Sequence, residues 1–300
     1  MTANMMELLL AARELPTKQN PRYTTGIGAI DRIFTQMGIS GLEVGAYVLG
    51  GDPGCGKSTF CLQVMEGLAK KGHMAVYCAY EGRSNIAGVI KRMGLAPLIS
   101  VVDQSTPGWE PSTDQLCQSM HQFAAENTTG KPLVMCIDSI KNLDSGSTDA
   151  RKKAIKKLHD TVHETQVILL IVAHATKESQ GKRLKKLEGP TELVGQSDVL
   201  LYLVDTTPHE KKGLGVRHVT LDISSKNRFG MTGEFHGFTL REGGFSWPVS
   251  LTGVKGPVVG TEGNRPDTRE TASQGKAAGC MKVQAQWPTQ KELDDAFQEF

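Results

Sequence analysis

The hydrophobic and polar positions of this chain follow a regular pattern over most of its length. From residue 26 to about residue 250, short apolar runs are separated by stretches in which apolar side chains recur every three or four positions. Such runs are typical of parallel strands buried on both faces, and the spaced pattern is typical of amphipathic helices. We therefore predict one α/β domain over residues 26–250, a mostly parallel sheet with helices on both faces. Its clearest strands are expected at residues 46–49, 74–80, 133–139, 167–173 and 216–225.

The N-terminal segment, residues 1–25, is predicted to be a helical arm and linker outside this domain. Apolar residues share one face of a helix over residues 4–15, where Asn4 can cap the first turn and Pro16 follows the last. A linker then leads to the domain. We expect the apolar face of this helix to pack on an adjacent subunit.

The C-terminal segment, residues 251–300, is predicted to be a flexible tail. Residues 258–286 contain few aliphatic side chains, which indicates a segment that cannot form a packed core. Further on, Leu293, Phe297 and Phe300 recur at helical spacing among acidic residues, so the tail is expected to end in a short acidic amphipathic helix. This helix is either a docking peptide for a protein partner or a solubilising end, and the pattern favours neither.

Composition and charge limit the class of protein. The chain of 300 residues carries a net charge of +2, so binding to a polyanion requires local clusters of basic residues. Its six cysteines include no C-x-x-C pair, and we expect neither zinc nor disulfides. The longest apolar runs are too short to cross a bilayer and the N-terminus has no basic leader, so we expect a cytoplasmic protein with no membrane partner.

The loop after the first predicted strand carries the clearest chemical signal. It matches the phosphate-binding pattern G-x-x-x-x-G-K-[ST], and a predicted helix follows it. Main-chain N–H groups and the positive end of the helix bind phosphates in such loops. We expect Lys57 to reach the terminal phosphates of a nucleoside triphosphate and Ser58 to ligate Mg²⁺. The predicted nucleotide-binding residues are Gly51, Asp52, Pro53, Gly54, Cys55, Gly56, Lys57, Ser58 and Thr59.

Three further predicted strands end in polar residues that could serve the same site. One ends in Asp138, which we expect to hold the hydration shell of Mg²⁺. Another is followed by Glu81, which is placed to deprotonate the water that attacks the γ-phosphate, although a surface glutamate would give the same pattern. A third is followed by His174 and Thr176, which could sense the γ-phosphate; a structural role for His174 fits equally well.

Two basic segments, residues 151–157 and 177–186, are candidates for binding nucleic acid. The second is polar and contains glycine, so it could follow a phosphate backbone, and nucleotide state could alter its conformation. The first has the pattern of a helix whose lysines could simply be solvated. Neither segment contains an aromatic residue, which favours contacts with phosphates over base stacking. The predicted DNA-binding residues are Lys182, Arg183, Lys185 and Lys186.

A pair of cations lies at the end of the last predicted strand. In an extended chain Lys226 and Arg228 point to the same side. Two cations presented together could complete an active site across a subunit interface, where positive charge stabilises the γ-phosphate in the transition state. A surface β-turn is the alternative interpretation.

The motifs of this chain, taken in order, closely resemble those of the RadA/Sms family of bacterial DNA-repair ATPases. The resemblance covers roughly residues 24–246 and is strongest in the last of the shared motifs. We expect the chain to lack the zinc module with which that family begins and the protease-like domain with which it ends. A second acid that the family often has after Glu81 is missing. The shared motifs are GIGAIDR, GGDPGCGKST, CIDSI, AHATK and KNRFG.

The resemblance implies a RecA-like fold and ATP hydrolysis at the interfaces of a hexameric ring that moves on single-stranded DNA in recombination, repair or replication. DnaB-type hexameric helicases share this core. The roles that carry over are phosphate and metal binding for Lys57, Ser58 and Asp138, and catalysis for Glu81. The KNRFG cations are Lys226 and Arg228.

The sequence therefore predicts an ATPase with the activity of a DNA helicase or translocase. The alternative is a regulatory switch that resembles the KaiC group, whose ATPase ring acts on protein partners. The basic segment 177–186 favours the motor, whereas the acidic end of the tail fits the switch. A small-molecule kinase is the weakest alternative because such an enzyme needs neither the basic segment nor KNRFG.

Overall fold

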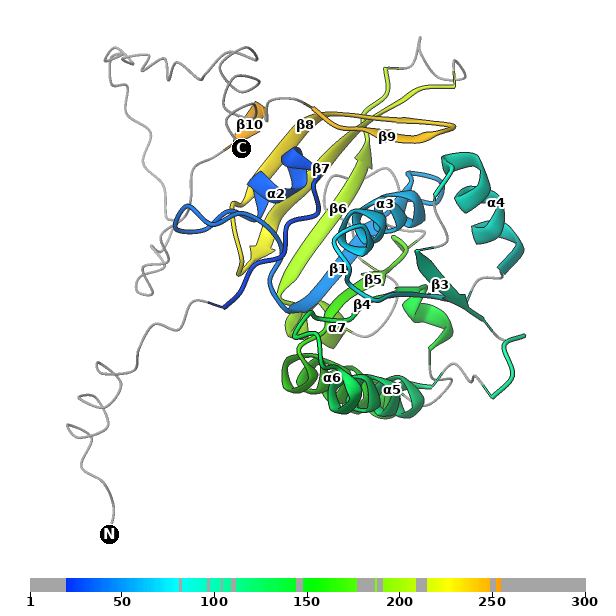
Figure 1. Ribbon diagram of the computed structural model, residues 1–300. Helices are drawn as coiled ribbons and strands as arrows, with labels where there is room; N and C mark the ends of the chain where they lie inside the picture. Colours follow the sequence, from blue (N-terminus) through cyan, green and yellow to red (C-terminus); the bar gives the residue numbers. More distant parts are fainter. Residues whose placement is uncertain are drawn as a thin grey trace, which may run out of the picture. The chain divides into compact units, whose positions relative to one another are not determined.

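The computed structural model describes most of the predicted domain (Figure 1). The predicted N-terminal helix, Glu81, the basic segment 177–186 and the acidic end of the tail lie outside the described residues. The described residues are 20–80, 83–95, 98–103, 105–108, 112–143, 148–176, 187, 191–208, 215–248 and 252–254.

Ten strands in this part of the chain form one sheet, in the order β10, β8, β7, β6, β1, β5, β4, β2, β3, with β9 paired to β8. The six strands from β6 to β3 run parallel, and the strands beyond β6 are antiparallel. The prediction of a mostly parallel sheet is confirmed. The strands are β1 (Gly45–Gly51), β2 (Ala75–Ala79), β3 (Ile99–Val102), β4 (Val134–Asp138), β5 (Ile168–Val172), β6 (Val199–Asp205), β7 (Arg217–Asn227), β8 (Gly233–Arg241), β9 (Gly244–Ser246) and β10 (Thr252–Val254).

Helices cover both faces of the sheet (Figure 1). On one face lie α2 (Gly28–Ile33), α3 (Lys57–Ala69) and α4 (Arg83–Met93). On the other lie α5 (Thr113–Glu126), α6 (Thr148–Thr165) and α7 (Thr191–Gln196). A short 3-10 turn, Ile140–Asn142, follows β4.

Two hydrophobic clusters, one on each face, hold the layers together. Side chains of β1 alternate between them: Tyr47 and Leu49 pack with α3, whereas Val48 packs with the α5–α6 side. Leu62 and Val162 are fully buried on opposite faces. Because β1 is buried on both sides, its sequence is a continuous apolar run, which is why the pattern located it.

The segment before α2 packs against the domain instead of standing apart from it. Tyr23 pairs with Leu42 through main-chain hydrogen bonds of 2.8 and 2.9 Å. The guanidinium of Arg22 forms an ion pair with Glu43 and donates to the carbonyl of Phe229 at 2.7 Å. Residues expected to form the end of a linker are thus held by long-range pairing, which hydrophobic periodicity does not reveal.

Membrane insertion through a helix finds no support in the described part of the chain. None of the helices there is long and apolar enough to span a bilayer.

Candidate active site

The phosphate loop connects β1 to α3 at the carboxyl edge of the parallel strands. Gly56 precedes the helix with φ +95°, a left-handed conformation that favours glycine. A Cβ atom at this position would lie 2.7 Å from Cδ2 of Leu240. Glycine therefore allows both the turn and its close packing on β8, so that the first N–H groups of α3 face the loop.

Lys57 lies beneath this loop and is 5% exposed. Its Nζ donates hydrogen bonds of 2.9 Å to the carbonyl oxygens of Gly51 and Asp52. A buried ammonium requires such partners, because an unpaired charge away from water is costly. These bonds fix the cation at the base of the loop, next to the N-terminus of α3.

Ser58 and Asp138, both predicted as residues of a Mg²⁺ site, lie in direct contact. Ser58 Oγ donates to Asp138 Oδ2 at 2.5 Å, and Asp138 is 4% exposed. The Tyr77 hydroxyl donates to the same carboxylate oxygen. Burial, with the nearby Cys136 and Asp138, raises the pKa of Tyr77 well above its ordinary value, so the phenol stays protonated and remains a donor.

Tyr77 is a site residue that sequence reasoning missed. It lies on β2 opposite Cys136 of β4, two positions before the pair formed by Ala79 and Asp138. Only the pairing of β2 with β4 brings the phenol to the carboxylate. A tyrosine inside an apolar run carries no separate signal for this contact.

A cavity of about 950 Å³ opens from the phosphate loop. Its wall brings cationic side chains from three further elements, Arg92 of α4, Arg217 of β7 and Arg241 of β8. The Arg217 guanidinium donates to the carbonyl of Gly54 within the loop. Positive charge around a loop with inward N–H groups suits a polyanionic ligand such as a triphosphate. None of these three arginines was predicted as a site residue.

The segment after β5 runs beside the loop. The N–H of Ala175 donates to Gly51 O at 3.1 Å, and its neighbour His174 lines the cavity. Thr176 is half-buried next in the chain. This places the predicted sensors next to the loop, with His174 facing the cavity.

The predicted catalytic acid, Glu81, lies outside the described residues. The residue before it, Tyr80, lies beside Asp138. The N–H of Tyr80 donates to Asp138 O at 2.7 Å. The DNA-binding prediction for Lys182, Arg183, Lys185 and Lys186 likewise concerns residues outside the described part of the chain.

Lys226 and Arg228 lie near the end of β7, at the opposite end of the parallel strands from the phosphate loop. β7 runs antiparallel to β6, so Asn227 pairs with Val199 at the start of β6, whereas the other end of β7 reaches the loop through Arg217. Lys226 Nζ donates to Gly195 O at 2.7 Å. Arg228 Nη1 lies 2.9 Å from Asp198 Oδ1. The two cations therefore cannot act on the nucleotide of their own subunit.

Burial lowers the pKa of Lys226, and the nearby Arg228 lowers it further, against the opposing effect of Asp198. The burial arises because the lysine packs against the carbonyls of Val194 and Gly195 at the end of α7.

A model of the family described as the KaiC ATPase matches residues 23–189. The chain belongs to this family. The match begins before α2 and includes the phosphate loop and Asp138, whereas Arg217 and Arg241 of the cavity wall lie beyond it.

Curated relatives confirm the resemblance to RadA. The DNA repair protein RadA of Brucella abortus is 28% identical over 268 residues, which cover 82% of this chain and 52% of the relative. RadA of Haemophilus influenzae is 29% identical over 238 residues, which cover 77% of this chain and 46% of the relative. The chain thus spans about half the length of the curated relatives it matches.

Solved structures confirm the RecA-like ATPase fold. A structure described as an ATPase domain superposes with a TM-score of 0.60 at 15% identity, covering 83% of this chain and 100% of that one. A DnaB-like replicative helicase, described with its interactions with primase, gives a TM-score of 0.60 at 16% identity and covers 82% of this chain and 67% of that one.

Proposed function

We propose that this chain is an ATP-driven motor that forms a ring and acts on single-stranded DNA, in the manner of a helicase or branch-migration enzyme. The observation that carries the proposal is the separation of Lys226 and Arg228 from the phosphate loop by the length of β7. Positive charge at one edge and a nucleotide site at the other suit a head-to-tail contact between subunits. Such heterologous contacts form a ring when the rotation between successive subunits closes.

The residues at the loop fit Mg-ATP. Lys57 and the N-terminus of α3 would bind the phosphates, and Arg217 would support the loop from β7. Ser58 and Asp138, already in contact, would hold Mg²⁺ directly and through its hydration shell. The metal supplies charge neutralisation to the phosphates when it is bound.

Hydrolysis needs a base and further positive charge. Glu81, two residues after β2, would orient and deprotonate the attacking water. Lys226 and Arg228 of the adjacent subunit would approach the γ-phosphate and stabilise the charge that develops there. His174, on the wall of the same cavity, and Thr176 would sense whether the γ-phosphate is present.

DNA is the partner suggested by the relatives, which are named as a repair protein and as a replicative helicase. On this chain Lys182, Arg183, Lys185 and Lys186 would contact the phosphates of the strand. Their segment follows His174 in the sequence, so nucleotide state could reach the DNA through a short stretch of chain.

Two measurements test the proposal: the rate of Mg-ATP hydrolysis with and without single-stranded DNA, and the mass by light scattering with a non-hydrolysed ATP analogue. We expect stimulation by DNA that weakens steeply with salt, and a mass near six subunits. Reversing the four charges at Lys182, Arg183, Lys185 and Lys186 should abolish the stimulation while leaving the basal rate unchanged. A persistent monomer with turnover independent of DNA would contradict the motor.

The match to the KaiC ATPase model favours one alternative, a regulatory switch that acts on protein partners. In that case deletion of residues 287–300 would change function, and charge reversal in the basic segment would change nothing. The opposite pattern is expected of the motor.

A further inference from the structure

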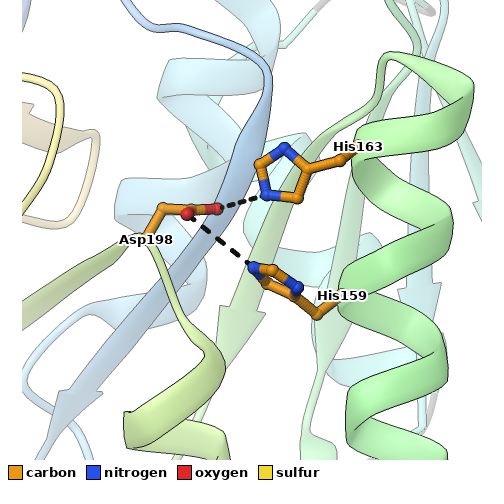
Figure 2. Close-up of side chains that lie close together, drawn as sticks. All are labelled: His159, His163 and Asp198. Carbon is orange, nitrogen blue, oxygen red and sulfur yellow. Dashed lines mark hydrogen bonds and ion pairs between the residues drawn. The ribbon is translucent and has the colours of Figure 1, made fainter. Parts of the chain in front are cut away.

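Two histidines of α6 and one aspartate before β6 lie close together (Figure 2). The aspartate bonds to Ala46 at the start of β1, whereas the phosphate loop follows the other end of that strand. His159 and His163 are four residues apart on one face of the helix, and their ring centroids lie 4.6 Å apart. His163 Nε2 is 3.0 Å from Asp198 Oδ2, and His159 Nε2 is 3.8 Å from Asp198 Oδ1. One nitrogen from each ring and a carboxylate oxygen lie within 4.8 Å of one another.

Asp198 is held as metal-binding carboxylates are usually held. Its side chain is 1% exposed, and the N–H of Ala46 donates to Oδ2 at 2.9 Å. This hydrogen bond fixes the orientation of the carboxylate, and such outer contacts orient ligands in metal sites.

His159 supplies the second indication of a ligand. Its Nε2 is buried, and no residue in the described part of the chain offers it a hydrogen bond. The other ring nitrogen, Nδ1, lies 3.4 Å from Asp160 Oδ1. Buried polar atoms are almost always paired, because an unpaired one retains its full desolvation cost. This nitrogen faces Asp198 and His163, so a cation placed among the three would satisfy it.

We propose that His159, His163 and Asp198 form a binding site for a divalent transition-metal ion of the Zn²⁺ type. Two imidazole nitrogens four residues apart on a helix, with one carboxylate from another element, are a donor set that suits such an ion and leaves a position for water. The His163 side chain is 40% exposed, which gives the ion a path from solvent.

The site shares Asp198 with Arg228. Arg228 Nη1 is 2.9 Å from Oδ1, the same oxygen that faces His159. A dication next to this oxygen would repel the guanidinium, so metal binding and the Arg228–Asp198 ion pair oppose each other. This consequence rests on the proposed function: an ion in the site would release Arg228 for the nucleotide of the adjacent subunit.

The test is titration of the metal-free full-length protein with Co²⁺, whose visible absorption reports tetrahedral ligation. We expect one Co²⁺ per chain, displaced by Zn²⁺, without the charge-transfer bands of thiolate ligands. The variants His159→Gln and Asp198→Asn should each bind about 10-fold more weakly or worse. His121→Gln is the matched control, since His121 is exposed on α5 and lies outside the cluster.

Asp198 is buried, so Asp198→Asn could fold poorly. The test therefore also uses His159→Gln and His163→Gln, and circular dichroism checks that both variants are folded. Arg228→Gln should strengthen Co²⁺ binding by about 5-fold or more, the effect of removing one charge at close range. Absence of the visible bands, or equal affinity in His159→Gln, would overturn the metal site. A Co²⁺ affinity of Arg228→Gln equal to that of wild type would contradict the claim that metal binding and the Arg228–Asp198 ion pair oppose each other. Neither result depends on ATP hydrolysis or on ring assembly.

Discussion

At the scale of single residues, the candidate site depends on contacts whose partners lie far apart in the sequence. Ser58 and Asp138, which lie in contact, were both predicted as residues of a Mg²⁺ site because each has a recognisable position, one in the phosphate loop and one at the end of an apolar strand. Tyr77 and Arg217 were not predicted. Their contacts follow from the pairing of β2 with β4 and from the return of β7 along β6. No local pattern encodes either pairing.

Arg217 provides a test of the cavity. Arg217→Ala removes the charge-assisted hydrogen bond to Gly54 O, and we expect the KM for ATP to rise about 10-fold, with a smaller change in kcat. Arg217→Lys should recover part of the loss because it keeps the charge. The measurement is steady-state ATPase kinetics.

Arg32→Ala is the matched control for this prediction, since exposed Arg32 also donates to a carbonyl, that of Gly28, at 3.0 Å but lies on α2 away from the cavity. Equal KM values for wild type and Arg217→Ala would show that β7 takes no part in nucleotide binding.

His73 makes a prediction about pH. It is 8% exposed, and burial lowers its pKa below 6.5, an effect increased by Lys131 and Lys71 and opposed by the Pro132 carbonyl. As the pH falls through 6.5, the unfolded chain binds more protons than the folded one. The free energy of unfolding therefore decreases as the pH is lowered. The slope from one proton is at most about 1.4 kcal/mol per pH unit.

Urea denaturation of wild type and His73→Gln at pH 7 and pH 5.5 measures this contribution. We expect wild type to lose more stability than the variant over this interval. A wild-type loss equal to or smaller than that of His73→Gln would contradict the depressed pKa.

At the scale of elements, the sequence predicted the strands whose position follows from a local hydrophobic pattern. The strands β1, β4 and β5 are apolar runs buried on both faces, and each was located to within two residues. Of the antiparallel extension beyond β6, β7 was predicted as a strand at residues 216–225, but its direction and its neighbours β8, β9 and β10 were not assigned. β10 pairs with β8 although it lies past residue 250, in the segment that was predicted to be a flexible tail. Strand order is set by long-range packing, which periodicity does not contain.

The packing of α3 against the segment before α2 gives a prediction at this scale. A Cβ atom on Gly67 would lie 2.1 Å from the carbonyl oxygen of Thr25. Gly67→Ala should therefore destabilise the protein by about 1–3 kcal/mol, despite the higher helix propensity of alanine. The measurement is the free energy of unfolding in urea.

Gly88→Ala is the control, because Gly88 also lies inside a helix and a Cβ there would meet only the flexible Arg92 side chain, at 3.4 Å. That variant should be neutral or more stable by up to about 1 kcal/mol. If both variants behave alike, the close approach of α3 to Thr25 is wrong.

At the scale of the whole molecule, the sheet separates two sets of charges. The phosphate loop and Arg217 lie at one edge, and Lys226 and Arg228 lie at the other, where α7 and Asp198 hold them. The sequence predicted that the cations are presented together. It did not predict that Arg228 is paired with an aspartate of its own subunit, because Asp198 precedes β6 and reaches Arg228 only through the β6–β7 pairing.

The account requires that each active site be shared between two subunits, and mixing two inactive variants tests this directly. Lys57→Ala removes the phosphate-loop cation and Arg228→Ala removes the cation offered to the neighbour, so each should lose at least about 100-fold in kcat when alone. Melting curves establish that both variants remain folded.

When equal amounts of the two variants are mixed under conditions of subunit exchange, an intact loop of one meets an intact Arg228 of the other at about a quarter of the interfaces in a head-to-tail ring. The measurement is the ATPase rate of the mixture. We predict that activity returns to about a quarter of the wild-type rate, in proportion to those interfaces. A mixture as inactive as its components, or an Arg228→Ala variant with full activity alone, would contradict a shared site.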